Sequence, residues 1–187
     1  LIIDLQSLAP EDEADAWRTA IRGLKRRSIL NDWRVFIGHS RAYAGDWYDL
    51  TAEVVAAAAD IPALRVAEIE GEVTRRDLHP EIREILDRYE AELDQQWPQL
   101  VKTYREARAT FYAAMGKDDW SMVERAWRQD AGRWKRFYDL NQRYVGEIEE
   151  KLMRRSLEDA AAWRKHAMRA IFREDRTHGG STRCVRS

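Results

Sequence analysis

The sequence has few of the residues that cross-link, turn or break a chain. Its 187 residues include one cysteine, four prolines and nine glycines. The single Cys184 excludes an intramolecular disulfide and a cluster of thiolate metal ligands. Nine scattered glycines do not form the glycine-rich loops that bind phosphates or dinucleotides. The longest apolar run, Val54 to Ala59, is far shorter than the ~20 residues of a membrane span.

An excess of charge of one sign is also missing. There are 32 basic and 33 acidic residues, so no global field favours nucleic acid or an acidic surface as the main partner. Charged residues make up 35% of the chain. High charge with few helix breakers is typical of long solvated helices.

Apolar residues recur at helical spacing, and no segment alternates as a strand does. We therefore predict an all-α fold of long amphipathic helices, forming a bundle or an extended helical hairpin with a disordered C-terminal tail. The predicted regions are an N-terminal helical region (1–78), a long helical hairpin (79–176) and the tail (177–187).

The N-terminal region is expected to contain three helices. The first begins at Pro10, because proline suits the first helical position. The second begins at Asn31 or Asp32 and runs to about residue 60. A short third helix runs from 62 to 76.

The hairpin is expected to contain two helices. The first spans about 80–115, and its apolar stripe advances in an 11-residue repeat, with a kink at Pro98. The second runs from Trp120 to about Glu174 and would be roughly 80 Å long at 1.5 Å per residue. Gly132 and Gly146 are its expected interruptions. A helix of that length must project from a small globule or pack against another chain.

Catalytic and metal-binding patterns are not recognisable. The four histidines are His39, His79, His166 and His178, and none is spaced to share a metal with another histidine or a glutamate. We predict no catalytic residue, no metal site and no cofactor, and interpret most carboxylates as partners of arginines four residues away.

The last helix offers a candidate interface with other protein chains. Three of its tryptophans are spaced by seven residues and share one face, and buried aromatics anchor many protein interfaces. The predicted interface residues are Trp120, Trp127, Trp134, Tyr138 and Trp163. Residues 151–187 carry ten basic and four acidic side chains, which suits nucleic acid, an acidic partner or lipid head groups.

One stretch resembles a known family. Tyr104-Arg105-Glu106-Ala107-Arg108, then Asp118-Asp119-Trp120-Ser121-Met122-Val123, then Trp134 to Tyr144 are similar to subunit d of the mitochondrial ATP synthase peripheral stalk. The resemblance covers residues 94–150, under a third of the chain. It implies a non-catalytic scaffold on the matrix side of the inner mitochondrial membrane, associated with that membrane through its partners. Without it, the expected location is the cytoplasm.

Three hypotheses follow. The first is a non-catalytic structural subunit of a multi-protein assembly, with the peripheral stalk as the named example. The second is a homo-oligomeric helical binding module, associated with nucleic acid through the basic C-terminal segment. The third is a helical enzyme whose carboxylates carry no recognisable spacing.

Overall fold

The computed structural model describes Ile21, Gly23 and residues 49–171, except for the side chains of Trp134 and Ile171. The chain divides into two compact units, Leu1–Trp47 and Tyr48–Ser187. Of the first unit only Ile21 and Gly23 are described, and both are helical. The helix expected from Pro10, the first part of the second helix and the tail at 177–187 lie outside the described residues.

The described part of the second unit confirms the all-α prediction. Its elements are α2 (Leu50–Ala57), two 3₁₀ turns (η2, Pro62–Leu64; η3, Arg75–Asp77), α3 (Pro80–Met115), α4 (Trp120–Met153) and α5 (Leu157–Ile171). No strand occurs among these residues, and the nearest approach to one is an isolated bridge between Arg65 and Leu78.

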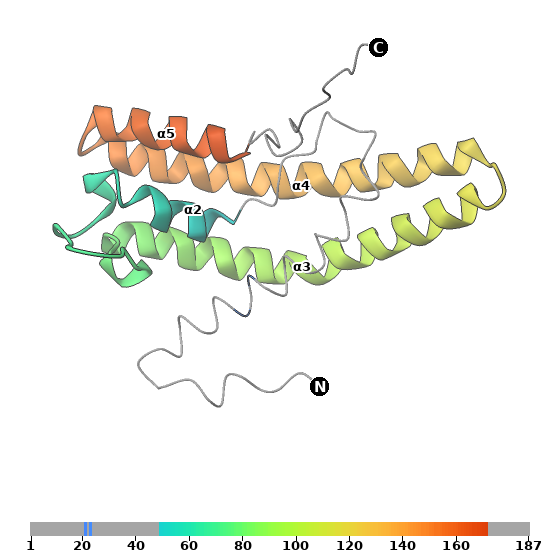
Figure 1. The fold of residues 1–187 in the computed structure, drawn as a ribbon, viewed down its shortest axis with the longest axis horizontal. Helices are drawn as coiled ribbons and strands as arrows, with labels where there is room; N and C mark the ends of the chain where they lie inside the picture. The colour runs from blue at the N-terminus through green and yellow to red at the C-terminus, as the bar shows by residue number, and fades with distance from the viewer. Residues whose placement is uncertain (1–20, 22, 24–48, 172–187) are drawn as a thin grey trace, which may run out of the picture. The chain divides into compact units, whose positions relative to one another are not determined.

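Helices α3 and α4 form an antiparallel hairpin that extends along the whole length of this unit (Figure 1). The bounds of α3 match the predicted 80–115. A tight turn follows, in which Asp118 adopts a left-handed φ of 55°. Asp119 then caps α4, because its carboxylate accepts a hydrogen bond from the backbone N–H of Met122 at 3.2 Å.

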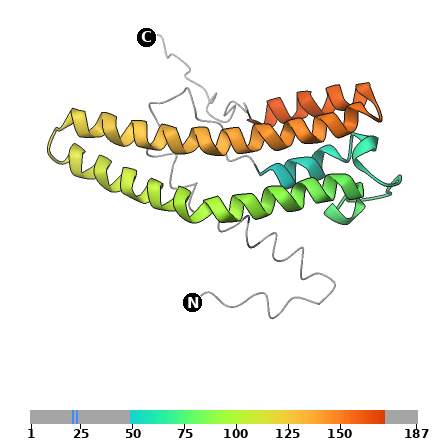
Figure 2. The ribbon, with the colours of Figure 1, turned by 180° about the vertical axis from the view of Figure 1, so that it is seen from behind.

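The helical stretch expected from Trp120 to about Glu174 is interrupted in the structure, but at neither of the two expected glycines. Helix α4 ends at Met153, and after a short turn α5 folds back beside it (Figures 1 and 2). Ser156 starts the new helix by accepting a hydrogen bond from the backbone N–H of Asp159 at 3.1 Å. The glycines at 132 and 146 do not interrupt α4. Mid-helix glycine costs only about 1 kcal/mol, which the packing of so long a helix offsets.

The expected second and third helices also differ from the structure. Helix α2 begins only at Leu50, with Asp49 as its N-cap, so no continuous helix runs through this point to residue 60. In place of a helix over 62–76, the chain forms the two 3₁₀ turns joined by an irregular segment. Gly71 has a φ of 117°, which a right-handed helix cannot contain.

The hairpin has two halves, which differ in whether other helices cover it. We call residues 49–97 and 139–171 the base half and residues 98–138 the tip half. In the base half, α2 and α5 add to the hairpin, and both stop near its middle in the two views (Figures 1 and 2). The axis of α3 bends near its middle in the same views, and Pro98 lies at the middle of its sequence, as the predicted kink requires.

The core of the base half consists of large side chains. Fully buried side chains come from all four helices and from the segment between α2 and α3: Leu50, Val54, Leu64, Leu78, Ile82, Leu86, Tyr89, Leu93, Ile148, Leu152 and Trp163. The apolar stripe of α3 is buried at Leu86, Leu93 and Leu100. Phe111, further along the same stripe, is only half-buried, because beyond Tyr104 the buried positions of α3 move to Ala107 and Ala114.

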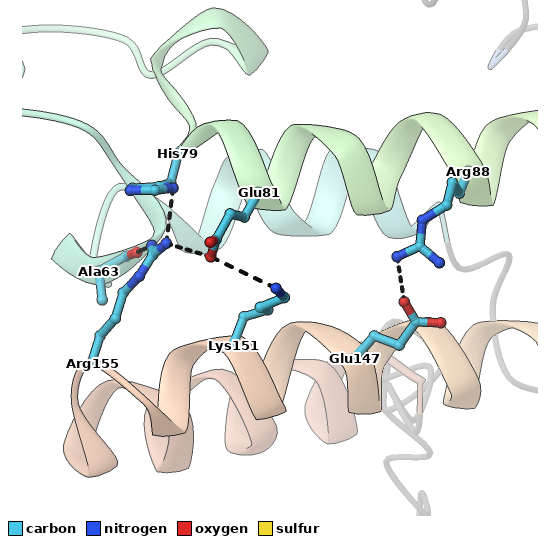
Figure 3. Close-up of polar contacts among 7 residues, drawn as sticks. All are labelled: Ala63, His79, Glu81, Arg88, Glu147, Lys151 and Arg155. Carbon is cyan, nitrogen blue, oxygen red and sulfur yellow. Dashed lines mark hydrogen bonds and ion pairs between the residues drawn. The ribbon is translucent and has the colours of Figure 1, made fainter.

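Polar contacts also close the base of the hairpin (Figure 3). Arg155, in the turn between α4 and α5, donates hydrogen bonds to the carbonyl of Ala63 (3.2 Å), to Nδ1 of His79 (2.9 Å) and to Glu81 (2.8 Å). Lys151 lies 3.9 Å from the same Glu81 carboxylate. One guanidinium thus holds the 3₁₀ segment, the start of α3 and the end of α4 together.

Candidate functional site

Helix α4 has two different apolar stripes. One faces α3 and contains the buried residues Val123, Ala126, Phe137 and Tyr144. The second stripe is the one that the sequence analysis identified, and it lies beside the first. It contains Trp120, Trp127, Tyr138, Val145 and Leu152, at steps of seven or eleven residues, which return to the same side of a helix.

The second stripe has a different environment in each half of the hairpin. In the base half, α5 covers it: the indole N–H of the fully buried Trp163 donates a hydrogen bond to the carbonyl of Val145 at 3.1 Å. In the tip half the same stripe is exposed. Trp120 is 65% exposed, Tyr138 40% and Trp127 37%.

Helix α3 extends this exposed surface. Tyr112 and Met115 are 50% and 45% exposed. Phe111 joins the two helices, because its ring centroid lies 5.6 Å from that of Tyr112 and 6.5 Å from that of Trp127. We call Tyr112, Met115, Trp120, Trp127 and Tyr138 the tip face. Exposed aromatic and apolar side chains that gather on one part of a protein surface often mark interaction sites.

The predicted interface residues therefore have different positions. Trp120, Trp127 and Tyr138 lie together on the tip face. The side chain of Trp134 lies outside what the structure describes. Trp163 belongs to the intramolecular core, and it does so because α5 folds back on α4 instead of continuing it. Tyr112 and Met115 were not predicted. They could have been predicted by noting that the short turn brings residues 111–115 next to residues 120–127.

A buried ion pair lies between the two helices of the tip half. Nε of Arg133 is 3.2 Å from Oδ1 of Asp130, and both side chains are 6% exposed. Burial raises the pKa of Asp130 to about 6, against the opposing effect of Arg133. Burial likewise lowers the pKa of Arg133 to about 10. The sequence analysis missed this pair, because it paired carboxylates with arginines four residues away, whereas Asp130 and Arg133 are three residues apart.

A groove of about 500 Å³, lined mainly by charged and amide-bearing residues, lies between α3 and α4 near the middle of the hairpin. Glu92 accepts hydrogen bonds there from Arg143, from Tyr144 (2.9 Å) and from Gln96 (3.0 Å). The hydrogen bond from Arg143 is the main cause of the lowered pKa of Glu92. A carboxylate held ionised by three donors is a poor general acid or base, so this groove favours a structural role.

Possible metal ligands do not cluster in the described part of the chain. Among residues 49–171 no three histidine, cysteine, aspartate or glutamate side chains converge on a possible metal position. His79 contacts Arg155, and Nε2 of His166 lies 3.0 Å from Glu53, which links α5 to α2. Both histidines thus connect elements of the base half.

Three of the six basic side chains in the described part of the C-terminal segment form ion pairs within the chain. Lys151 and Arg155 contact Glu81, and Arg164 contacts Glu149 at 3.1 Å. These pairs reduce the positive field that a nucleic-acid phosphate would meet. Within residues 49–171, none of the helices combines the length and the apolar character that crossing a membrane requires.

Comparisons with known proteins do not place the chain in a family. No protein-family model, no curated protein and no solved structure matches it.

Proposed function

We propose that this protein is a non-catalytic structural subunit of a multi-protein assembly, and that it binds another chain through the tip face. One observation carries the proposal: a single stripe of α4 is covered by α5 at Val145 but exposed at Tyr138, Trp127 and Trp120. Exposed aromatic side chains in a row are favourable when a partner removes them from water.

The resemblance of residues 94–150 to subunit d names one assembly of this kind. The peripheral stalk of the mitochondrial ATP synthase is therefore the specific complex to test. The fold of the hairpin supports an elongated scaffold, since a helix of 36 residues followed by one of 34 extends over roughly 50 Å at 1.5 Å per residue.

The experiment compares full-length variants in the cells that make the protein. The wild-type chain and a Trp120→Ala/Trp127→Ala variant are purified under native conditions, and their molecular masses are measured by light scattering. The wild type is expected in a complex of constant stoichiometry, and the variant as the free chain, because truncating two aromatic anchors removes most of the binding free energy.

The matched control removes exposed apolar side chains from the base half. Met153 and Leu157 are 45% and 74% exposed, so Met153→Ala/Leu157→Ala deletes similar surface away from the tip face. This variant is expected to remain in the complex. A wild-type chain that runs alone in fresh lysate, or a control that dissociates as readily as the tip-face variant, contradicts the proposal.

A further inference from the structure

The charge of the hairpin changes along its length in a way that describes a partner. The tip half contains nine basic and five acidic residues, a net charge of +4. The base half contains twelve basic and nineteen acidic residues, a net charge of −7. The chain as a whole is nearly neutral, but the fold places positive net charge in the tip half and negative net charge in the base half.

Basic side chains also border the tip face. Arg105 lies seven residues before Tyr112 on the same side of α3 and is exposed. The guanidinium of Arg108 lies 5.6 Å from the centroid of the Tyr112 ring. Lys117 is exposed in the turn. An apolar centre with a basic border binds a surface of the opposite character, apolar in the middle and acidic at its edge.

The base half indicates what shape of partner would fit the tip face. There α5 lies along the same stripe of α4 and packs against it with Ala160, Trp163, Ala167 and Ala170, all buried. From Trp120 to Tyr138 the exposed part of the stripe extends for roughly 27 Å, at 1.5 Å per residue. That is the length of an 18-residue helix lying alongside α4.

We propose that the tip face binds an amphipathic, net-negative helix of a partner protein, in the position along α4 that α5 occupies in the base half. This inference rests on the proposed function and adds the chemistry of the partner. A second copy docked tip to tip would bring two net-positive halves together, which is unfavourable. Insertion of the tip into the hydrocarbon core of a membrane is also disfavoured, because it would bury the exposed Asp118.

The test uses the full chain and two labelled peptides of 18 residues. Both carry the apolar face of α5, and their outward positions are all glutamate in one and all lysine in the other. Binding is measured by fluorescence anisotropy at low and high salt. The glutamate peptide is expected to bind at least about tenfold more tightly than its lysine twin at low salt, and this preference should shrink at high salt.

Two variants locate the binding. Trp120→Ala/Trp127→Ala is expected to weaken binding of the glutamate peptide at least about tenfold. Arg105→Glu/Lys117→Glu is expected to remove the preference for glutamate while helix content stays unchanged, because it alters the border and leaves the apolar centre intact. Met153→Ala/Leu157→Ala is the control and should bind as the wild type does.

Several results would overturn the inference. Equal or tighter binding of the lysine peptide removes the charge argument, as does the absence of binding to either peptide. Two further measurements test the alternative partners, a second copy of the chain and a membrane. Dimerisation in sedimentation that Trp127→Ala abolishes assigns the face to a second copy, and co-sedimentation with phosphatidylserine vesicles that the same variant abolishes assigns it to a membrane. If the native complex still depends on the tip face, the proposed function survives each of these outcomes.

Discussion

The base and tip halves use the same two helices but differ in what holds them together. In the base half, four helices bury large aliphatic and aromatic side chains. In the tip half, α3 and α4 meet through a smaller core, in which the large side chains of Leu100, Tyr104 and Phe137 are joined by small residues and by the buried pair of Asp130 and Arg133. The base half therefore carries most of the apolar burial that stabilises the fold, while the tip half leaves several aromatic side chains, including Trp120, Trp127 and Tyr138, exposed.

The strongest way to test this difference is to delete a tryptophan from each half. Trp163→Ala removes a fully buried side chain and its hydrogen bond to Val145, and should lower the free energy of unfolding by roughly 3–5 kcal/mol. Trp120→Ala removes an exposed side chain and should change it by less than about 0.5 kcal/mol. Urea denaturation followed by circular dichroism measures both. Similar losses for the two variants would show that the halves do not differ in this way.

The two halves should also respond to pH with opposite signs. The pKa of Asp130 is raised to about 6 in the folded chain, from an ordinary 3.8. The folded state therefore binds the proton more tightly than the unfolded state. Its contribution to stability is present below about pH 4 and is lost as pH rises through 6, by up to roughly 3 kcal/mol. Glu92 has a lowered pKa, so its contribution is present at neutral pH and is lost on acidification.

Two variants separate these contributions from the rest of the titration. The stability of the wild type minus that of Asp130→Asn should fall between pH 4 and pH 7. The same difference for Glu92→Gln should rise with pH at the acidic end of this range. Chemical denaturation at several pH values provides both curves. A flat curve for Asp130 would mean that its carboxylate is ionised as easily inside the fold as outside it.

The helix caps provide a smaller test of how far the halves unfold together. Asp49 caps α2 in the base half and Asp119 caps α4 in the tip half, each with an acceptor distance of 3.2 Å. Alanine at either position should cost about 1 kcal/mol. Because the tip half has the smaller core, we expect only Asp119→Ala to accelerate tryptic cleavage within residues 98–138. Asp119→Ser, which keeps a cap, should not. Equal acceleration by Asp49→Ala would indicate that the halves open as one unit.

Effects of about 1 kcal/mol or less are expected at two turns with positive φ. Asp118→Gly in the tip should stabilise the chain by about 0.5 kcal/mol, because glycine adopts a φ of 55° without strain. Gly71→Ala in the base should destabilise it by about 1 kcal/mol, although a Cβ there meets no atom within 4 Å. Thermal denaturation of both variants tests whether one substitution stabilises the chain and the other destabilises it. A stabilising Gly71→Ala would contradict the conformational argument.

The spacing of apolar residues predicted the long helices, because each of them buries one apolar face that repeats along its whole length. It identified α3 at its observed bounds, and it found the stripe of α4 that carries the tip face. It did not distinguish a stripe covered by α5 from the same stripe exposed, since both have the same spacing. That distinction depends on where α5 turns back.

The turn itself had a local signal that the sequence analysis did not use. Ser156-Leu157-Glu158-Asp159 has the spacing of a capping box, and Ser156 does cap α5. The irregular segment over 58–79 was harder to predict, because its bridge between Arg65 and Leu78 is a tertiary feature. The inward position of Asp130 and Arg133 was unexpected for a similar reason: charged residues rarely occupy an inner face unless they are paired.

Hydrogen exchange at the indole N–H of Trp163 makes the opening of α5 directly observable. The indole nitrogen is buried and bonded to the carbonyl of Val145, so deuterium can replace that proton only when α5 separates from α4. The indole proton of Trp120 is solvent-accessible by comparison and should exchange at once. The exchange rate of this single resonance, measured by nuclear magnetic resonance, therefore reports the opening free energy of the base half without any substitution.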